Sequence, residues 1–246
     1  MKISNSIYLV ASGDLGIGLT NKADCNVYLV DCGSTKVLVD SGVGIDSSRI
    51  LGEIENDKIS CKDISHILLT HHHADHAGGA AFFRKKLRCE VTAPAEEADS
   101  IEESDESVLG LDVAKRAGYY PPDYAFPACK VDHRVRTKES FTIGNITFSV
   151  YEGSGHSLGG VCYYARIDGH FSLFAGDLVS QGGFISLQNI PGTDIHNYSR
   201  SVLALEGLPV DSLFPGHGCF SLTNGHAHLD TAIKAFRSLG IPHNAI

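Results

Sequence analysis

Residues 70–79, which read THHHADHAGG, constrain the fold of this chain more than any other segment. Within six positions they supply four imidazole or carboxylate side chains, those of His71, His73, Asp75 and His76. Such groups are the ligands that zinc and similar divalent ions prefer. The apolar stretch at 65–70 is predicted to be a strand. Because α/β folds commonly carry their chemistry at the carboxyl ends of strands, we expect a metal-binding loop at a sheet edge.

Further candidate ligands recur later in the chain, each next to a glycine and each after an apolar stretch. They are His156 in GHS at 155–157, Asp177 after Gly176, and His217 in PGHG at 215–218. A polyhistidine surface loop is the alternative for residues 71–76. The later histidine and aspartate residues disfavour the surface-loop alternative. If each of them follows a strand, several strands bring candidate ligands to the same sheet edge.

A second HxH pair, His226 and His228, is an alternative to His217. The sequence favours His217, because Pro215 and Gly216 can turn the chain toward the sheet edge after a predicted strand at 212–214. His226 and His228 instead fall in the first turn of a predicted helix, where side chains two positions apart diverge.

Strand and helix signals alternate along both halves of the chain. Apolar stretches separated by turn residues predict strands at 7–11, 26–31, 36–40, 65–70, 89–93, 140–143, 146–152, 160–167, 170–175 and 212–214. Apolar residues at helical spacing predict helices at 47–56, 80–87, 197–205 and 227–239. The first three strands are expected to be antiparallel. No linker divides the chain, so we expect one α/β domain over residues 1–246.

Residues 95–128 depart from this alternation, and we expect an inserted lid or rim there. Acidic residues crowd positions 96–106, which is typical of a solvated helix face. Tyr119, Tyr120 and Tyr124 follow and are candidates for substrate binding, with ordinary packing under a lid as the alternative.

The composition excludes several classes of function. The chain has 246 residues, with 20 Lys and Arg against 29 Asp and Glu and a formal net charge of -9. Nucleic acid is therefore not an expected partner, since phosphate binding needs basic side chains. No stretch resembles a signal peptide or is long enough for a membrane span. The seven cysteines form no CxxC pair, which favours a reduced, cytoplasmic protein.

In order and spacing, HxHxDH at 71–76, His156, Asp177 and His217 resemble the metallo-β-lactamase superfamily. The resemblance begins at VDSG, residues 39–42, and extends to His217. It implies a four-layer αβ/βα sandwich, in which two mixed sheets are flanked by helices. It also implies one metal held by His71, His73 and His156, a second held by Asp75, His76 and His217, and Asp177 bridging both. By the same resemblance, Asp40 supports the site without being a ligand.

Two divalent ions close together would stabilise a bridging hydroxide and polarise the oxygen of a carbonyl or phosphoryl group. Zinc is the expected metal, with iron or manganese as alternatives. Hydrolysis of this kind needs no nucleophilic serine, and the chain has no GxSxG motif. Asp75 is the candidate catalytic residue, since a carboxylate there can orient the attacking water or take its proton.

Matches and departures within the superfamily narrow the reaction. The familiar zinc β-lactamases carry Cys where this chain has Asp177, and glyoxalase II enzymes add a helical region after the position of His217. We therefore expect a hydrolase whose substrate is a small molecule, namely an ester, a lactone or a thioester. Assembly of the chain into a homodimer is left open. A mononuclear iron persulfide dioxygenase, using only His71, His156 and Asp177, is the alternative. A phosphodiesterase or β-lactamase-like hydrolase is a further one.

Overall fold

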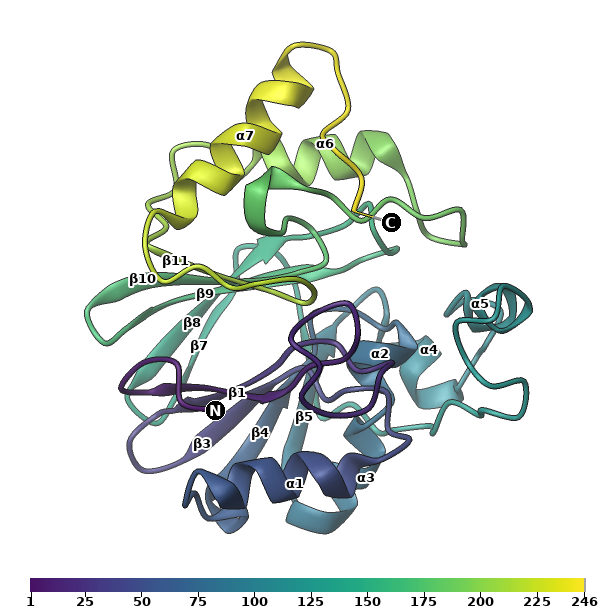
Figure 1. The fold of residues 1–246 in the computed structure, drawn as a ribbon, viewed down its shortest axis with the longest axis vertical. Helices are drawn as coiled ribbons and strands as arrows, with labels where there is room; N and C mark the ends of the chain where they lie inside the picture. The colour runs from purple at the N-terminus through teal and green to yellow at the C-terminus, as the bar shows by residue number, and fades with distance from the viewer. Residues whose placement is uncertain (246) are drawn as a thin grey trace.

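The computed structural model describes residues 1–245, and two facing β-sheets form its centre (Figure 1). The first sheet has the order β1-β2-β3-β4-β5-β6. Its strands are β1 (Ile7–Ala11), β2 (Val27–Asp31), β3 (Lys36–Val39), β4 (Ile64–Leu68), β5 (Glu90–Pro94) and β6 (His133–Val135). The second sheet has the order β11-β10-β9-β8-β7. Its strands are β7 (Ser140–Ile143), β8 (Ile146–Glu152), β9 (Val161–Ile167), β10 (His170–Gly176) and β11 (Ser212–Pro215).

Both sheets are mixed. In the first sheet β1, β2 and β3 are antiparallel, as expected, and β3 to β6 are parallel. In the second sheet β7 to β10 are antiparallel, and β11 lies parallel to β10. Parallel neighbours require crossover connections, and helices supply them. The carboxyl ends of β4, β8, β10 and β11 carry the candidate ligand loops.

Helices cover the outer face of each sheet (Figure 1). The first sheet is covered by α1 (Ser47–Asn56) and α3 (Ala80–Leu87), and the second by α6 (Ile195–Leu203) and α7 (Gly225–Arg237). The shorter elements are α2 (Ala74–Ala77), α4 (Ala98–Glu103), α5 (Leu111–Arg116) and the 3-10 turns η1 (Cys61–Asp63) and η2 (Gln181–Gly183). The order helix, sheet, sheet, helix confirms the four-layer sandwich. Within residues 1–245, no helix is both long and apolar enough to cross a bilayer.

Strand β2 illustrates how the sequence builds these layers. Successive side chains of a strand point to opposite faces of the sheet. Val27 and Leu29 therefore pack with α1 and α3, whereas Tyr28 and Val30 face the second sheet. Both faces of the strand are buried, which explains its uninterrupted apolar run.

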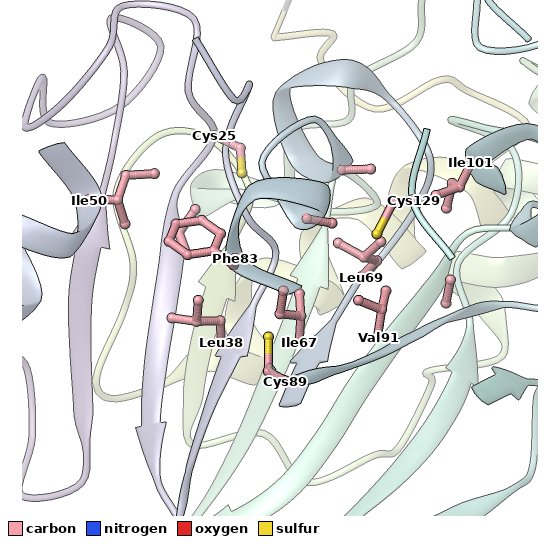
Figure 2. Packing of buried hydrophobic residues seen from close by; sticks show 14 of the residues in the cluster. Cys25, Leu38, Ile50, Ile67, Leu69, Phe83, Cys89, Val91, Ile101 and Cys129 are labelled. Carbon is pink, nitrogen blue, oxygen red and sulfur yellow. The ribbon is translucent and has the colours of Figure 1, made fainter. Parts of the chain in front are cut away.

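Three apolar layers result from this arrangement. One lies between the first sheet and its helices, where Leu38, Ile67 and Phe83 are fully buried (Figure 2). The middle layer lies between the sheets, and the third lies between the second sheet and α6 and α7. The packed layers hold the strand ends, and therefore the candidate site, in fixed relative positions.

The structure differs from the predicted elements in several places. Helices α6 and α7 each begin and end two residues earlier than predicted. The strand expected at 65–70 ends at Leu68, so Leu69 and Thr70 already belong to the ligand loop. That loop contains one helical turn, α2, which the prediction lacked. Strand β6 was also not predicted, because only three residues form it and His133 and Arg134 are exposed.

Residues 95–128, called the cap below, leave the first sheet between β5 and β6 and carry α4 and α5. Figure 1 shows α5 standing out from the body of the protein. Most of the acidic side chains in the cap reach solvent, as expected. The expectation of a solvated face is wrong for Glu97, which is 1% exposed. Its carboxylate accepts backbone hydrogen bonds inside the protein, which offset the cost of burying it.

Candidate metal centre

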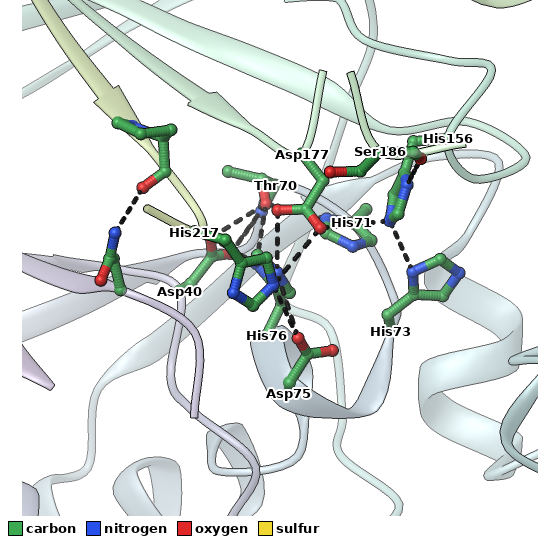
Figure 3. Close-up of polar contacts among 12 residues, drawn as sticks. Asp40, Thr70, His71, His73, Asp75, His76, His156, Asp177, Ser186 and His217 are labelled. Atoms are coloured by element: carbon green, nitrogen blue, oxygen red, sulfur yellow. Dashed lines mark hydrogen bonds and ion pairs between the residues drawn. The ribbon is translucent and has the colours of Figure 1, made fainter. Parts of the chain in front are cut away.

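Four loops at one edge of the sandwich bring together the seven candidate ligands (Figure 3). Residues 71–76 follow β4, and residue 156 lies between β8 and β9. Residue 177 follows β10, and residue 217 follows β11. The seven side chains are those of His71, His73, Asp75, His76, His156, Asp177 and His217. Both sheets therefore contribute to the same edge.

The first donor group consists of His71, His73 and His156. One ring nitrogen from each lies within 4.8 Å of the others. The Nδ1 atom of His73 is 2.9 Å from Nε2 of His156. On the far side of its ring, His156 directs Nδ1 at the carbonyl oxygen of Ser186, 2.5 Å away. That contact fixes the ring so that Nε2 faces the group, as in histidines that bind metals.

The second donor group consists of Asp75, His76 and His217, which satisfy the same spacing. Nε2 of His217 is 3.0 Å from Oδ2 of Asp75. Nδ1 of His76 is 2.9 Å from Oδ2 of Asp40, which leaves Nε2 of His76 facing the group. Asp40 is buried behind the histidine and also accepts the backbone N–H of Thr70 at 2.8 Å. In this position it orients His76 and stands outside the two groups.

Asp177 lies between the two donor groups. Its Oδ2 atom is 3.4 Å from Nε2 of His156 and 3.4 Å from Nε2 of His217. Its Oδ1 atom is 3.3 Å from Nε2 of His76. A carboxylate in this place can contact ions in both groups.

The donor atoms fit divalent metal ions. Among the described residues, Nε2 of His71, Nε2 of His76 and Oδ1 of Asp177 face the two groups and are buried without a hydrogen bond of good geometry. Each buried polar atom left unsatisfied costs about 1–3 kcal/mol. Imidazole and carboxylate donors that converge without partners are what zinc and related cations bind.

The two groups differ in their electrostatics. Burial and the neighbouring histidines hold the pKa of His71 and of His73 well below the usual range. Burial opposes the charged form of His217 as well, but Asp177 and Asp75 outweigh it and raise the pKa of His217 to about 10. Without metal, His71 and His73 are therefore neutral at pH 7. In the second group the pKa of His76, like that of His217, lies above the usual range, because the surrounding acidic groups outweigh burial.

A cavity of about 540 Å³ opens beside the two groups and is lined by His73, Asp75, Asp177 and His217, among others. Much of its wall is apolar and includes Leu111, Val113, Ala114, Ala117, Leu187 and Ile190. The cap contributes the first four of these, so the cap forms one side of the cavity.

The three candidate tyrosines of the cap lie in different environments. Tyr119 and Tyr120 line the cavity, and the Tyr120 hydroxyl donates to Oδ1 of Asp75 at 3.2 Å. Tyr124 does not line it. Its ring stacks on that of Tyr120 at 5.5 Å between centroids, and its hydroxyl donates to the carbonyl of Val43 at 2.7 Å.

The remaining histidines of the two HxH motifs point elsewhere. His72 turns away from the donor groups, and its Nδ1 lies 2.8 Å from Oγ of Ser100 in α4. His228 contacts Oγ of Ser221 at 2.7 Å, and His226 is exposed. The structure thus brings His217, and neither of its rivals, to the second donor group.

Gly216 permits the close approach of β11 to the site. A Cβ atom at this position would lie 2.3 Å from Oδ1 of Asp177 and 2.5 Å from Cε1 of His76. No larger residue fits there without moving two of the candidate ligands.

Sequence reasoning missed two residues near the site. Cys25 lies with Asp40 and His76 in a third close group of side chains, and burial raises the pKa of its thiol to about 12. Glu97 contacts the backbone of the ligand loops. Neither belongs to a spaced motif, and only the folded chain brings them to the site.

Comparison with known proteins places the chain in a family. A family model described as the metallo-beta-lactamase superfamily matches residues 21–217. Lactamase-like protein nscB of Neosartorya fischeri is 30% identical over 198 residues, which cover 78% of this chain and 48% of that protein. Thioesterase pkgB of Emericella nidulans is 28% identical over 195 residues, covering 78% and 45%. The chain thus spans about half the length of these two relatives.

The fold is also similar to that of solved structures. A β-lactamase from Chitinophaga pinensis superposes with a TM-score of 0.73 over 97% of this chain and 91% of that one, at 15% identity. At this identity the likeness concerns the fold alone. Together with the family match over most of the sequence, it leads to one conclusion: the chain belongs to the metallo-β-lactamase superfamily.

Proposed function

We propose that this chain is a hydrolase that holds two divalent metal ions, zinc in the first place, and cleaves a small ester, lactone or thioester. The observation that carries the proposal is the pair of donor groups that share Asp177 and open onto an apolar cavity. A relative named as a thioesterase favours the thioester among these substrates.

In this proposal His71, His73 and His156 hold one ion, and Asp75, His76 and His217 hold the other, with Asp177 between them. When bound, the two ions would lower the pKa of a water molecule and polarise the carbonyl oxygen of the substrate. The chain needs no serine or cysteine nucleophile for such a reaction.

Asp75 is the proposed catalytic residue. Its carboxylate lines the cavity, and burial is outweighed by His76 and His217, which hold the pKa of Asp75 well below its usual range. It is therefore ionised at neutral pH and can orient an attacking water through Oδ2. The Tyr120 hydroxyl, which donates to Oδ1, keeps the carboxylate in place.

The cavity supports a substrate with an apolar acyl group. The cap would act as the wall that selects this group, since Leu111, Val113 and Ala114 face it. Lys22 is the only lysine or arginine among the described residues lining the cavity, and it has no carboxylate within 4.0 Å in residues 1–245. It is placed to pair with an anionic group of the substrate, such as a carboxylate or phosphate.

The test is a substrate panel on protein stripped of metal and reloaded with zinc. We expect hydrolysis of apolar acyl thioesters, lactones or aryl esters that is abolished by a chelator and restored by zinc. Asp177→Ala should lose both metal and activity, because its carboxylate faces both donor groups. Binding of one iron per chain with oxygen consumption on a persulfide would overturn the proposal and favour the dioxygenase.

A further inference from the structure

Glu97 is a buried carboxylate that the proposed reaction does not use. It lies at the start of the cap, directly before α4, and its side chain is fully buried. Within residues 1–245, no lysine or arginine nitrogen lies within 4.0 Å of its carboxylate. The one basic side chain within that distance is His72, whose Nε2 is 3.9 Å from Oε1 of Glu97. Burying an unpaired carboxylate is costly, so its hydrogen bonds must offset that cost.

The two oxygens of Glu97 accept hydrogen bonds from two different ligand loops. Oε2 accepts the backbone N–H of His72 at 2.7 Å, between His71 and His73. Oε1 accepts the backbone N–H of Gly159 at 2.7 Å, in the loop that carries His156. One carboxylate therefore joins the two loops that build the first donor group. Hydrogen bonds to a charged acceptor are roughly twice as strong as neutral ones.

The packing around these contacts is close. A Cβ atom on Gly159 would lie 2.5 Å from Cβ of Glu96, the residue before Glu97, so glycine at 159 lets the loop come close to the start of the cap. On the other side, Ser100 in α4 donates to the carbonyl of Glu97 and contacts Nδ1 of His72. The start of the cap is thus tied to the histidine loop through both backbone and side chains.

We infer that Glu97 is a positioning residue that sets the spacing of His71 and His73 relative to His156, and through it the metal affinity of the first donor group. The inference rests on the proposed function only in that the first group binds metal. Glu97 makes no hydrogen bond or ion pair with Asp75, His76 or His217, so the second group should not depend on it.

The experiment separates the two donor groups by deleting one at a time. Zinc affinity is measured by chelator competition for Glu97→Gln in a His217→Ala background, which leaves the first group intact. The same substitution is measured in a His71→Ala background, which leaves the second group intact. Glutamine keeps the size of the side chain, but its NH₂ group cannot accept a hydrogen bond. One of the two backbone N–H groups, that of His72 or that of Gly159, therefore loses its acceptor. Glu96→Gln, at an exposed neighbouring position, is the matched control.

We expect Glu97→Gln to weaken zinc binding about 10- to 100-fold in the His217→Ala background, the usual effect of removing a partner that orients metal ligands. In the His71→Ala background the change should stay below about threefold on the same reasoning. Cobalt substitution should show an altered visible spectrum for the first group only, and Glu96→Gln should change neither affinity.

Equal weakening in both backgrounds would overturn the inference and assign Glu97 a general structural role, and no weakening in either would also overturn it. Glu97→Asp covers the case in which Glu97→Gln does not fold, because it keeps the charge but is too short to reach both loops, and the same selective loss is expected. Failure of the proposed function is a separate result, since a chain that binds zinc without hydrolysing any substrate still permits these measurements.

Discussion

At the scale of single residues, the site depends on groups that direct the histidines as much as on the histidines themselves. The Ser186 carbonyl sets the ring of His156, and Asp40 sets that of His76. Each contact occupies one ring nitrogen and leaves the other for the donor group. Asp40 itself has a left-handed backbone, with φ of 63°, which few residues other than glycine adopt. Its hydrogen bonds to Thr70 and His76 hold it there.

Gly216→Ala tests how tightly the second donor group is packed. The added methyl group would collide with Asp177 and His76, so we expect zinc binding to weaken by at least about tenfold. Gly52→Ala is the control, because nothing lies within 4 Å of a Cβ there and alanine suits the middle of α1. Metal analysis after dialysis against a weak chelator measures both. Full zinc occupancy in Gly216→Ala would show that the site is looser than the structure indicates.

The charge of His217 predicts proton release when metal binds. Its pKa of about 10 means that it is protonated at pH 7 without metal, and a metal ion must displace that proton. His71 and His73 have lowered pKa values and are already neutral. Zinc binding by the second group should therefore strengthen as pH rises toward 10 and weaken as pH falls, by about tenfold per unit for each proton displaced from His217 and from His76, whose pKa is also raised.

Calorimetry in buffers of different ionisation enthalpy measures this release. Wild-type protein should release at least one more proton per chain on zinc binding than His217→Ala, which keeps only the first donor group intact. The same proton count for both proteins at pH 7 would contradict the assigned charge of His217.

The residues of the site could be predicted from the sequence to the extent that they form spaced motifs next to strands. His217 was distinguishable from His226 because Pro215 and Gly216 follow a strand that ends at the site. The burial of Glu97 could not be predicted, since its acidic neighbours indicate a solvated face and only the fold shows that its carboxylate points inward. Which ring nitrogen each histidine presents also depends on contacts distant in sequence, such as that of His156 with Ser186.

At the scale of elements, most strands and helices were predictable because their apolar patterns match their burial. Strand β8 and helices α1 and α3 begin and end where the patterns predict. The failures are short or polar elements: β6 owes its place to pairing with β5, and α2 is one turn enforced by the ligand loop. The pairing of strands into two sheets rested on the family resemblance, since periodicity alone does not specify which strands pair.

Helix α5 of the cap is predicted to control the size of the acyl group. Ala114→Phe places a ring into the cavity, and we expect KM for long-chain acyl thioesters to rise while zinc content stays unchanged. Arg116→Phe, on the same helix but exposed, is the matched control and should leave KM unaltered. Loss of zinc from Ala114→Phe would instead show that the cap supports the metal centre directly.

At the scale of the whole molecule, each donor group combines ligands from both sheets. His71 and His73 come from the first sheet and His156 from the second, and the second donor group likewise joins Asp75 and His76 to His217. The sandwich places the carboxyl ends of β4, β8, β10 and β11 at one edge, so binding of metal would join the two halves of the fold. This placement explains why the candidate ligands are spread over most of the sequence.

The central claim is that two metal ions occupy these two groups around Asp177. A crystal structure of the zinc-loaded protein, with anomalous diffraction recorded on either side of the zinc edge, tests it most directly. The account predicts two anomalous peaks about 3.5–4 Å apart, one among His71, His73 and His156 and the other among Asp75, His76 and His217. A single fully occupied peak, with Asp75 and His76 turned away from it, would contradict the account.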